Sequence, residues 1–408
     1  MCLNFCKKKK GTHWTETTIA TSLQVHSRTA TRAHVTHLLF QQCDVLHRES
    51  FRIKLYPAWW FQTDTESAKA SALALLVHLN HCYLISLVNT FFVCHAGEIY
   101  SAYDILSGEE VAIKFETGSP PFSQLQNEHK SYKVLGNRNG LPHVKWFGKD
   151  SDHNVMVLTL LGPSLERLWV ALGCQFKLET VVGIAEQMVR LNQQTWAWGL
   201  YISFDTQITL LEYIHSRHLI HRDIKPDNIL LGTGSTKNII HIIDFGLAKP
   251  FRSAETYIHI PCHTGQPLMG TARFASINAL SGIELSRRDD LESLSYVLIY
   301  FLRGLPWQGI RGDSKKKHAE VLQMKVSTSP RVLCDGLPAE FETFLNYARA
   351  LKFSQKPNYQ YLRDLMRGIS QLPKNTIFDN NLIAGVGVGS LGPDSSKTHG
   401  PPMAWRGR

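Results

Sequence analysis

Short apolar runs bounded by glycine and charged residues are the clearest pattern in the middle of the chain. Residues 155–162 form an apolar run that ends at a glycine, which predicts a buried strand. Residues 110–114 (Glu-Val-Ala-Ile-Lys) predict a second strand, and the polar stretch 126–133 between the two predicts a helix. A further apolar run, 239–247, is interrupted by one acidic residue, Asp244. The pattern therefore predicts a chain of mixed strand and helix content.

The two ends of the chain carry weaker patterns. The tail from 371 to 408 is rich in Gly, Ser and Pro and lacks periodicity, which predicts disorder. Residues 70–94 contain no charged side chain and exceed the roughly 20 residues that a membrane helix needs. The polar residues within this segment argue against a membrane helix; they are His78, Asn80, His81 and Asn89. A buried or partly disordered segment is the preferred interpretation.

Composition indicates which binding partners and which cellular compartment to expect. The 408 residues suffice for one large domain with tails, and the formal net charge of +10 favours acidic partners. No nucleic-acid motif is present, so no nucleic-acid partner is expected. The eight cysteines show no Cys-x-x-Cys or His/Cys metal spacing, which favours reduced thiols in the cytosol or nucleus. No signal peptide is readable, because the lysines at 7–10 precede a polar stretch.

Two polar motifs supply the candidate chemistry. Residues 221–228 read His-Arg-Asp-Ile-Lys-Pro-Asp-Asn and residues 244–246 read Asp-Phe-Gly, with room for one turn and a β-hairpin between them. The pair resembles the catalytic loop and the metal-binding loop of protein kinases. Phosphoryl transfer needs a carboxylate to orient and deprotonate the attacking hydroxyl, two oxygen ligands for Mg²⁺ and a cation near the phosphate. These roles fall, in that order, to Asp223, to Asn228 and Asp244, and to Lys225.

The nucleotide-binding residues are expected upstream of these motifs. Lys114 ends a predicted strand, and Glu128 is placed to pair with it from a helix and to fix its ammonium against ATP. Two solvated charges are the alternative interpretation. The run 155–162 would serve as the hinge that meets the adenine. The complete predicted ATP site is Gly97, Ile99, Ala112, Lys114, Glu128, Leu158, Leu160 and Leu161.

A third group of motifs narrows the resemblance. Residues 270–278 read Gly-Thr-Ala-Arg-Phe-Ala-Ser-Ile-Asn where most kinases have Ala-Pro-Glu, and residues 287–293 read Arg-Arg-Asp-Asp-Leu-Glu-Ser. Together with the stretches 160–166, 259–261 and 305–309, they resemble the casein kinase I family.

The resemblance extends from about Gly97 to about Arg367. It implies an α+β, two-lobed protein kinase fold, with a small β-rich lobe over 97–162 and a larger helical lobe over 163–370. It also implies ATP and Mg²⁺ as cofactors, acidic or phosphorylated protein substrates and a monomeric enzyme without a membrane partner. Asp290 matches the aspartate that braces the catalytic loop from a buried helix.

The resemblance also implies an anion site beside the substrate groove. Arg273 matches the family's arginine, and Lys315, Lys316 and Lys317 lie where the family carries further basic residues. A phosphoserine three positions before the target would gain charge-assisted hydrogen bonds there. His318 stands where the family has a distal lysine. The alternative interpretation of the three lysines is a solvated charge run or a nuclear-localisation patch.

The chain departs from the family in two places. Residues 1–96 are unassigned, because Gly97 alone remains of a glycine-rich hairpin whose first strand and other two glycines are expected to be absent. Residues 51–55 are a weak candidate for a remnant of that strand. Residues 189–207 are inserted where the family has one helix before the catalytic loop. Both segments are interpreted as translated non-coding sequence, with a genuine isoform as the alternative.

The predicted function is that of an ATP-dependent serine/threonine protein kinase of casein kinase I type. The retained Lys114, Asp223 and Asp244 favour catalysis, since a scaffold gains nothing from keeping them. The missing glycines favour the alternative, a pseudokinase-like scaffold or inactive splice product that binds partners without turnover.

Overall fold

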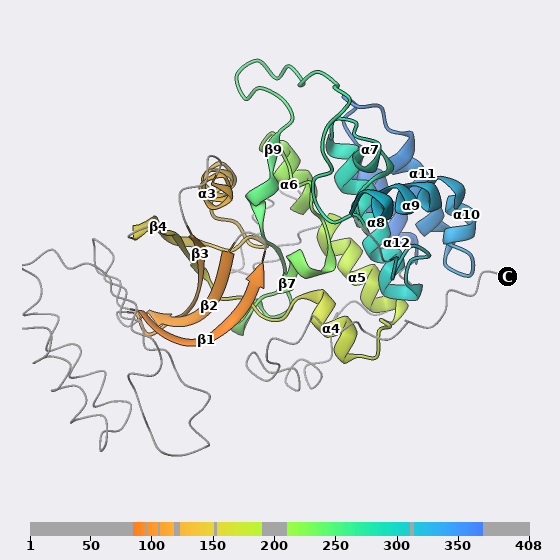
Figure 1. Ribbon diagram of the computed structural model, residues 1–408. Helices are drawn as coiled ribbons and strands as arrows, with labels where there is room; N and C mark the ends of the chain where they lie inside the picture. Colours follow the sequence, from red (N-terminus) through yellow and green to blue (C-terminus); the bar gives the residue numbers. More distant parts are fainter. Residues whose placement is uncertain are drawn as a thin grey trace, which may run out of the picture.

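The chain forms a two-lobed α+β fold in which a β-sheet lobe stands beside a larger helical lobe (Figure 1). The computed structural model describes residues 85–369 apart from 95–96, 105–106, 118–122, 151–152, 190–209 and 311–313. The predicted tail, the strand candidate at 51–55 and nearly all of the predicted insert lie outside the described residues.

The small lobe is a five-stranded antiparallel sheet with the strand order β1-β2-β3-β5-β4. Its inner face is apolar because alternate residues of neighbouring strands, such as Val111, Ile113, Val155 and Val157, point to the same side and are buried. The predicted strands correspond to β3 and β5. The strands are β1 Ile85–Cys94, β2 Gly97–Asp104, β3 Glu110–Thr117, β4 Val144–Asp150 and β5 His153–Thr159.

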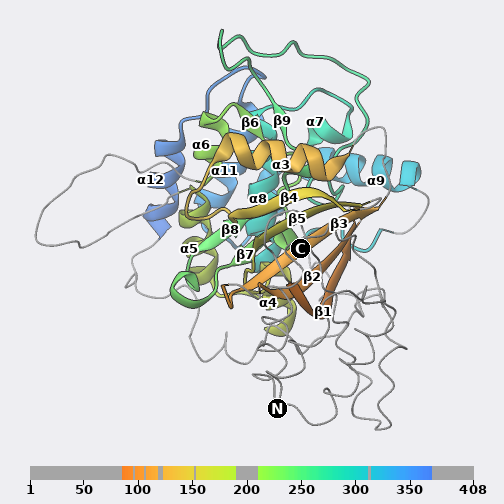
Figure 2. The same ribbon diagram turned by 90° about the vertical axis from the view of Figure 1, so that its left-hand side faces the viewer.

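One helix, α3 (Gln124–Leu135), crosses the small lobe beside the sheet, as Figure 2 shows. The Ser123 hydroxyl caps its first turn by accepting a hydrogen bond from the Gln126 N–H over 3.0 Å. Leu125, Tyr132 and Leu135 form its buried face at the spacing of a helix. Glu128 lies on the same face, so the sequence buries a carboxylate that needs a partner.

The large lobe is built around α8 (Arg287–Arg303), which packs against α5 and α11. Ser286 and Asp289 form a capping box at its start, and almost every residue from Asp289 to Phe301 is buried. A helix buried on all sides is a rigid support for the residues that it carries. The other helices are α4 Leu165–Ala171, α5 Leu178–Val189, α6 Leu210–Ser216, α7 Ile277–Leu280, α9 Ser314–Ser327, α10 Pro330–Leu333, α11 Ala339–Ala350 and α12 Tyr359–Ile369.

Short strands and single turns of 3-10 helix lie between the two lobes and shape the catalytic loop. The pairs β6 with β9 and β7 with β8 are antiparallel. Their bounds are β6 Leu219–Ile220, η4 Pro226–Asn228, β7 Ile229–Leu231, η5 Gly234–Thr236, β8 Ile240–Ile242, η6 Phe245–Leu247 and β9 Lys249–Pro250.

Strand β1 corrects the expectation that the first strand is absent. It pairs with β2 from Ile85 opposite Asp104 to Cys94 opposite Gly97, with two irregularities near Asn89. The sequence analysis relied on the glycine pattern, whereas strand formation requires only an extended chain that completes the edge of the sheet. The described end of the uncharged segment 70–94 is therefore a strand. Among the helices that the structure describes, none is long and apolar enough to cross a membrane.

The segment before the catalytic loop contains two separate helices. Helix α5 ends at Val189 and α6 begins at Leu210, and the two helices contact each other. Val189 is thus the last residue of α5. Residues 190–207 of the predicted insert lie outside the described residues, so its interpretation as non-coding sequence stays a hypothesis.

The pairing of β1 with β2 generates a prediction about stability. A chain that begins at Gly97 lacks β1 and leaves β2 as an exposed edge, whereas a chain that begins at residue 81 keeps the pair. Each lost backbone hydrogen bond costs about 0.5–1.5 kcal/mol. The shorter chain should therefore melt at least about 4 °C lower, because 1 kcal/mol corresponds to roughly 2–4 °C in a domain of this size. Differential scanning fluorimetry checks this, and equal melting temperatures would show that β1 is dispensable.

Candidate active site

The predicted catalytic aspartate, Asp223, is held from three sides. The Thr271 N–H donates to its Oδ1 over 2.9 Å, and the Lys225 Nζ lies 2.7 Å from its Oδ2. The Asn228 Nδ2 donates to the Asp223 backbone carbonyl over 3.0 Å and to Oδ2 over 3.3 Å. Burial alone would lower the pKa of Lys225, but the adjacent Asp223 carboxylate raises it above its usual value. The network therefore presents a fixed carboxylate beside a charged lysine.

The loop that carries Asp223 is braced by Asp290 of α8. The Arg222 N–H donates to Asp290 Oδ1 over 2.9 Å, and the His221 N–H donates to Oδ2 over 2.8 Å. His215 Nε2 lies 2.9 Å from the same Oδ2, and its Nδ1 lies 2.5 Å from the Tyr359 hydroxyl. Arg222 has a φ of +69°, a left-handed conformation that a side chain rarely adopts. The two hydrogen bonds to Asp290 hold the backbone in that conformation.

The predicted nucleotide lysine joins three parts of the fold at one amine. Lys114 on β3 lies 2.7 Å from Glu128 Oε2 on α3 and 3.2 Å from Asp244 Oδ1 in the Asp-Phe-Gly loop. The side chains of Lys114 and Glu128 are only 5% and 2% exposed, whereas that of Asp244 is 30% exposed. Lys114 and Glu128 thus form a buried ion pair between the sheet and α3, and Asp244 is the most exposed of the three side chains.

Burial and charge act differently on the two carboxylates that share Lys114. Burial raises the pKa of Glu128, and the Lys114 charge offsets this only in part. Burial also acts to raise the pKa of Asp244, but the charge and hydrogen bond of Lys114 outweigh it, so this pKa falls below its usual value. Asp244 is therefore an anion at neutral pH, as a metal ligand must be.

Phe245 anchors the Asp-Phe-Gly loop to both lobes. Its buried ring packs edge-on against Tyr132 of α3 and His221 of the catalytic loop, at centroid distances of 5.1 and 4.9 Å. The Asn127 Nδ2 donates to the Gly246 carbonyl over 2.9 Å. Helix α3 is thereby held against the loop, which keeps Glu128 within reach of Lys114.

The remaining predicted ATP-site residues lie on neighbouring strands. Ile99 on β2 is opposite Lys114, and Ala112 on β3 is opposite Leu158 on β5. Gly97 begins β2 and is opposite Cys94, the last residue of β1. These residues therefore lie on three adjacent strands of the sheet, β2, β3 and β5.

The predicted hinge follows β5. Leu160 and Leu161 are buried, and the Gly162 N–H donates to the Leu231 carbonyl over 2.8 Å. A Cβ at Gly162 would lie 2.9 Å from the Gly232 carbonyl oxygen, so only glycine permits this approach. The chain that links the two lobes is thus attached to β7, at the end of the catalytic loop.

The residues present suit a hard divalent cation between the two loops. The Asn228 Nδ2 is used by Asp223, so the amide oxygen is the atom left to act as a ligand. The backbone carbonyl of Asn228 accepts the Ile243 N–H over 3.0 Å, which ties Asn228 to the residue before Asp244. An amide oxygen and an ionised carboxylate are ligands that Mg²⁺ accepts. Asn228 and Asp244 could therefore hold this metal.

Comparison with protein-family models matches residues 94–356 to the protein kinase domain, which is more than half of the chain. The chain belongs to the protein kinase domain family. The matched region of this kinase begins at Cys94, the last residue of β1, and ends before Tyr359. It contains Lys114, Glu128, Asp223, Asn228, Asp244 and Asp290.

The predicted anion-site residues of the kinase lie on two elements. Arg273 lies in the segment before α7, with its Cζ 5.8 Å from the centroid of the Tyr300 ring. The Tyr300 hydroxyl donates to Glu166 over 2.9 Å, and burial with the nearby Asp227 charge raises the pKa of Glu166 to about 7. The other predicted members, Lys315, Lys316 and Lys317, are exposed in the first turn of α9.

Two residues of the site were missed at the sequence level. Thr271 binds both Asp223 and Lys225, through its N–H and its hydroxyl. Gly270 has a φ of +83°, and a Cβ there would lie 2.5 Å from the Arg222 carbonyl oxygen. Both belong to the stretch 270–278 that carries the resemblance, but neither spacing nor polarity indicates a contact with the catalytic loop.

The close approach of Gly270 predicts a difference between two glycines. Gly265→Ala places a Cβ in open space at a φ of +76°, so it should cost only the dihedral strain of about 1–2 kcal/mol. Gly270→Ala adds a backbone clash, and overpacking of this kind costs typically about 1–3 kcal/mol more. Urea unfolding of both variants measures the difference. Equal free energies of unfolding would mean that the segment moves away from the catalytic loop without cost.

Proposed function

We propose that this protein is a serine/threonine protein kinase of casein kinase I type that uses ATP with Mg²⁺. The observation that carries the proposal is the contact of Lys114 with Glu128 and Asp244, because it joins the sheet, α3 and the metal loop in one arrangement. The charge of Lys225 acts on both Asp223 and Asp244, so the group proposed to hold the metal lies near the proposed base. The proposal also favours a monomer in the cytosol or nucleus.

Each of these side chains would have a separate role in phosphoryl transfer. Asp223 would accept a hydrogen bond from the substrate hydroxyl and take its proton as the bond to phosphorus forms. Lys225 would stabilise the charge that develops on the transferred group, and Lys114 would hold the phosphates of the nucleotide. When bound, ATP supplies the phosphoryl group and Mg²⁺ supplies charge neutralisation. Asn228 and Asp244 would hold the metal.

One observation favours a second candidate function, a scaffold that binds partners without turnover. Cys94 and Gly97 are opposite each other at the end of the β1 and β2 ladder, and only His95 and Ala96 stand between them in the sequence. Gly97 is the one glycine in residues 85–104. A glycine-rich loop lets backbone N–H groups approach the phosphates closely, and a sequence with one glycine offers less of that freedom.

Substrate choice would follow from basic residues on two elements, the segment before α7 and the first turn of α9. Acidic residues or a phosphate group before the target serine or threonine would be attracted by four basic residues, Arg273, Lys315, Lys316 and Lys317. Arg273 supports this proposal best, because it lies two residues after Thr271, whose N–H is bound to Asp223. An anion held by Arg273 would thus lie near the catalytic carboxylate.

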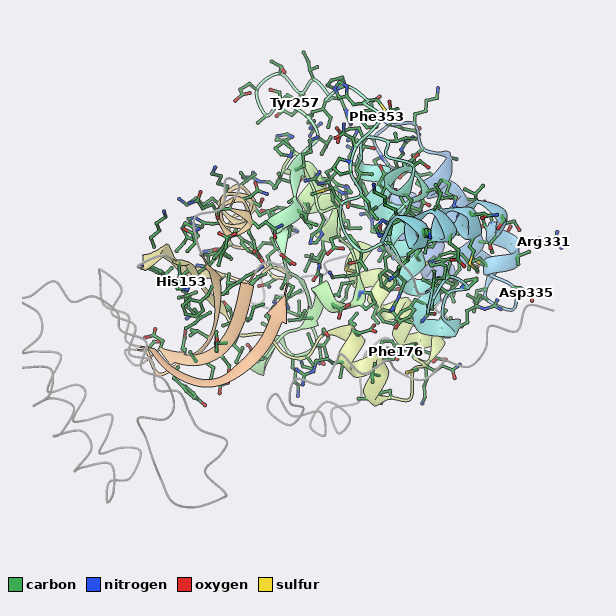
Figure 3. The ribbon with its side chains drawn as sticks, in the orientation of Figure 1. His153, Phe176, Tyr257, Arg331, Asp335 and Phe353 are labelled. Atoms are coloured by element: carbon green, nitrogen blue, oxygen red, sulfur yellow. The ribbon has the colours of Figure 1, made fainter. Side chains whose placement is uncertain are left out.

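The catalytic assignment is tested with three carboxylate variants. Asp223→Asn should lower kcat by about 10²- to 10⁴-fold, the usual contribution of a general base. Asp244→Asn should abolish most Mg²⁺-dependent transfer to a casein-like acidic protein, because an amide binds the metal less strongly than a carboxylate. The matched control is Asp335→Asn, an exposed residue on the side of the helical lobe away from the sheet (Figure 3). It should leave transfer unchanged.

Melting temperatures of these variants show whether the fold is intact. Equal activity of wild type and of the Asp223 and Asp244 variants would overturn the assignment. A folded wild type that transfers no phosphate at all would favour the scaffold instead.

A pair of peptides tests the anion site. The peptide with phosphoserine three residues before its target serine should have a higher kcat/KM than its unphosphorylated twin. Arg273→Ala should reduce that advantage by about 1.5–3 kcal/mol, the range for hydrogen bonds between charged groups. Arg331→Ala removes an exposed arginine on α10, remote from the site, and should leave it unchanged (Figure 3). If both peptides react equally well with wild type, the anion site does not exist.

A further inference from the structure

The segment that carries Arg273 depends on other elements for its hydrogen bonds. Residues 271–276 form a turn and belong to no helix or strand. Within the segment, the N–H groups of Phe274 and Ala275 donate to the Thr271 carbonyl over 2.9 and 3.0 Å. Ala272, Phe274 and Ala275 are buried, and buried carbonyl groups of such a turn need donors from outside.

Lys325 of α9 supplies two of these donors from beneath the segment. Its side chain is fully buried, and Nζ lies 3.1 Å from the Ala272 carbonyl oxygen and 2.5 Å from that of Ala275. The Trp307 Nε1 donates to the Arg273 carbonyl over 2.8 Å. Two side chains from distant parts of the sequence, Lys325 and Trp307, therefore bind the backbone carbonyls of Arg273 and of the residues around it.

The surroundings of Lys325 are built to hold an amine. Nζ lies 4.3 Å from the centroid of the Tyr296 ring and 4.9 Å from that of Trp307, so two aromatic faces stabilise its positive charge. Burial nevertheless lowers the pKa of Lys325 well below its usual value, although the nearby Glu292 charge raises it in part. An apolar side chain of similar volume would avoid this cost. The contribution of Lys325 thus lies in the hydrogen bonds that it makes.

A second layer fixes the end of the same segment. Glu292 of α8 accepts hydrogen bonds from the Ile277 N–H over 3.1 Å and from the Tyr296 hydroxyl over 2.6 Å. Arg349 of α11 donates to the same hydroxyl over 2.8 Å and to the Lys325 carbonyl over 3.4 Å. Three helices of the large lobe therefore converge under residues 272–277.

We propose that Lys325 is a positioning residue for substrate recognition, which acts by holding the carbonyls of Ala272 and Ala275 so that Arg273 faces the substrate. The inference rests on the proposed function, because it assigns Arg273 to the recognition of an anionic substrate group. Lys325 touches neither the nucleotide residues nor Asp223. Its loss should therefore weaken substrate binding and leave ATP binding intact.

The test compares Lys325→Met with Lys352→Met, an exposed lysine of the same lobe. For Lys325→Met, we expect the Kd of a fluorescent phosphoserine peptide, measured by anisotropy, to rise about tenfold, and KM for the peptide to rise equally. KM for ATP should stay within about twofold. Trypsin cleavage after Arg273, followed by mass spectrometry, should also accelerate, because the released segment becomes accessible. The Lys352 variant should match wild type in all four measurements.

Trp307→Phe provides a second variant that keeps the packing of an aromatic ring. It removes the donor to the Arg273 carbonyl and places a smaller ring beside Lys325, so peptide Kd should rise by about threefold to tenfold at unchanged KM for ATP. If Lys325→Met fails to fold, this variant decides the inference alone.

The possible outcomes separate the inference from the proposed function. A wild type that turns over, together with folded variants whose peptide Kd and trypsin cleavage are unchanged, overturns the inference and leaves the function standing. Equal losses in peptide binding and ATP binding also overturn it, because they indicate general destabilisation. A wild type that binds the phosphopeptide without turnover, with weaker binding in Lys325→Met, supports the inference and overturns the function. A wild type that neither binds nor turns over overturns both.

Discussion

The hydrogen bonds between Asp290 and the catalytic loop are the constraint on which the site depends. The loop is irregular and largely buried, so the N–H groups of His221 and Arg222 must find acceptors away from water, and the Asp290 carboxylate provides both. Burial alone would raise the pKa of Asp290, but the hydrogen bond and charge of His215 lower it below its usual value. The Asp290 carboxylate therefore stays ionised and fixes the position of the loop that carries Asp223 relative to α8.

The small lobe depends in turn on a second charged contact. Lys114 has one amine and two carboxylate partners, and the more buried partner, Glu128, is the one whose pKa rises. Breaking a buried pair by removing one member leaves an uncompensated charge, which is more costly than the pair itself is stabilising. The position of α3 is therefore coupled to the position of Asp244. The arrangement of these charges does not involve residues 94–97, so the shortage of glycines in that stretch leaves it intact.

The two loops and the strands around them could be predicted because each depends on residues that are close in the sequence, whereas the two lobes were implied by the resemblance to a kinase family. Asp223, Lys225 and Asn228 lie within one short loop, and the apolar runs around Lys114 and Leu158 predict their strands directly. Contacts between distant residues could not be predicted in this way. Lys325 lies 50 residues or more from the carbonyls that it binds, and a lysine within a polar helix resembles a solvated one. Strand β1 was missed because its pairing, and not its glycine content, defines it.

The first turn of α8 holds two separate segments, the catalytic loop and residues 276–278. Asp290 binds the catalytic loop, while Asp289 accepts hydrogen bonds from the Ser276 hydroxyl over 2.7 Å and from the Asn278 side chain over 3.0 Å. Glu292, one turn from Asp289, accepts the Ile277 N–H. The carboxylates of Asp289 and Asp290 lie in the first turn of the helix, where its dipole stabilises negative charge. Because neighbouring positions on one rigid helix hold the catalytic loop and residues 276–278, α8 fixes how the loop that carries Asp223 lies relative to the segment that follows Arg273.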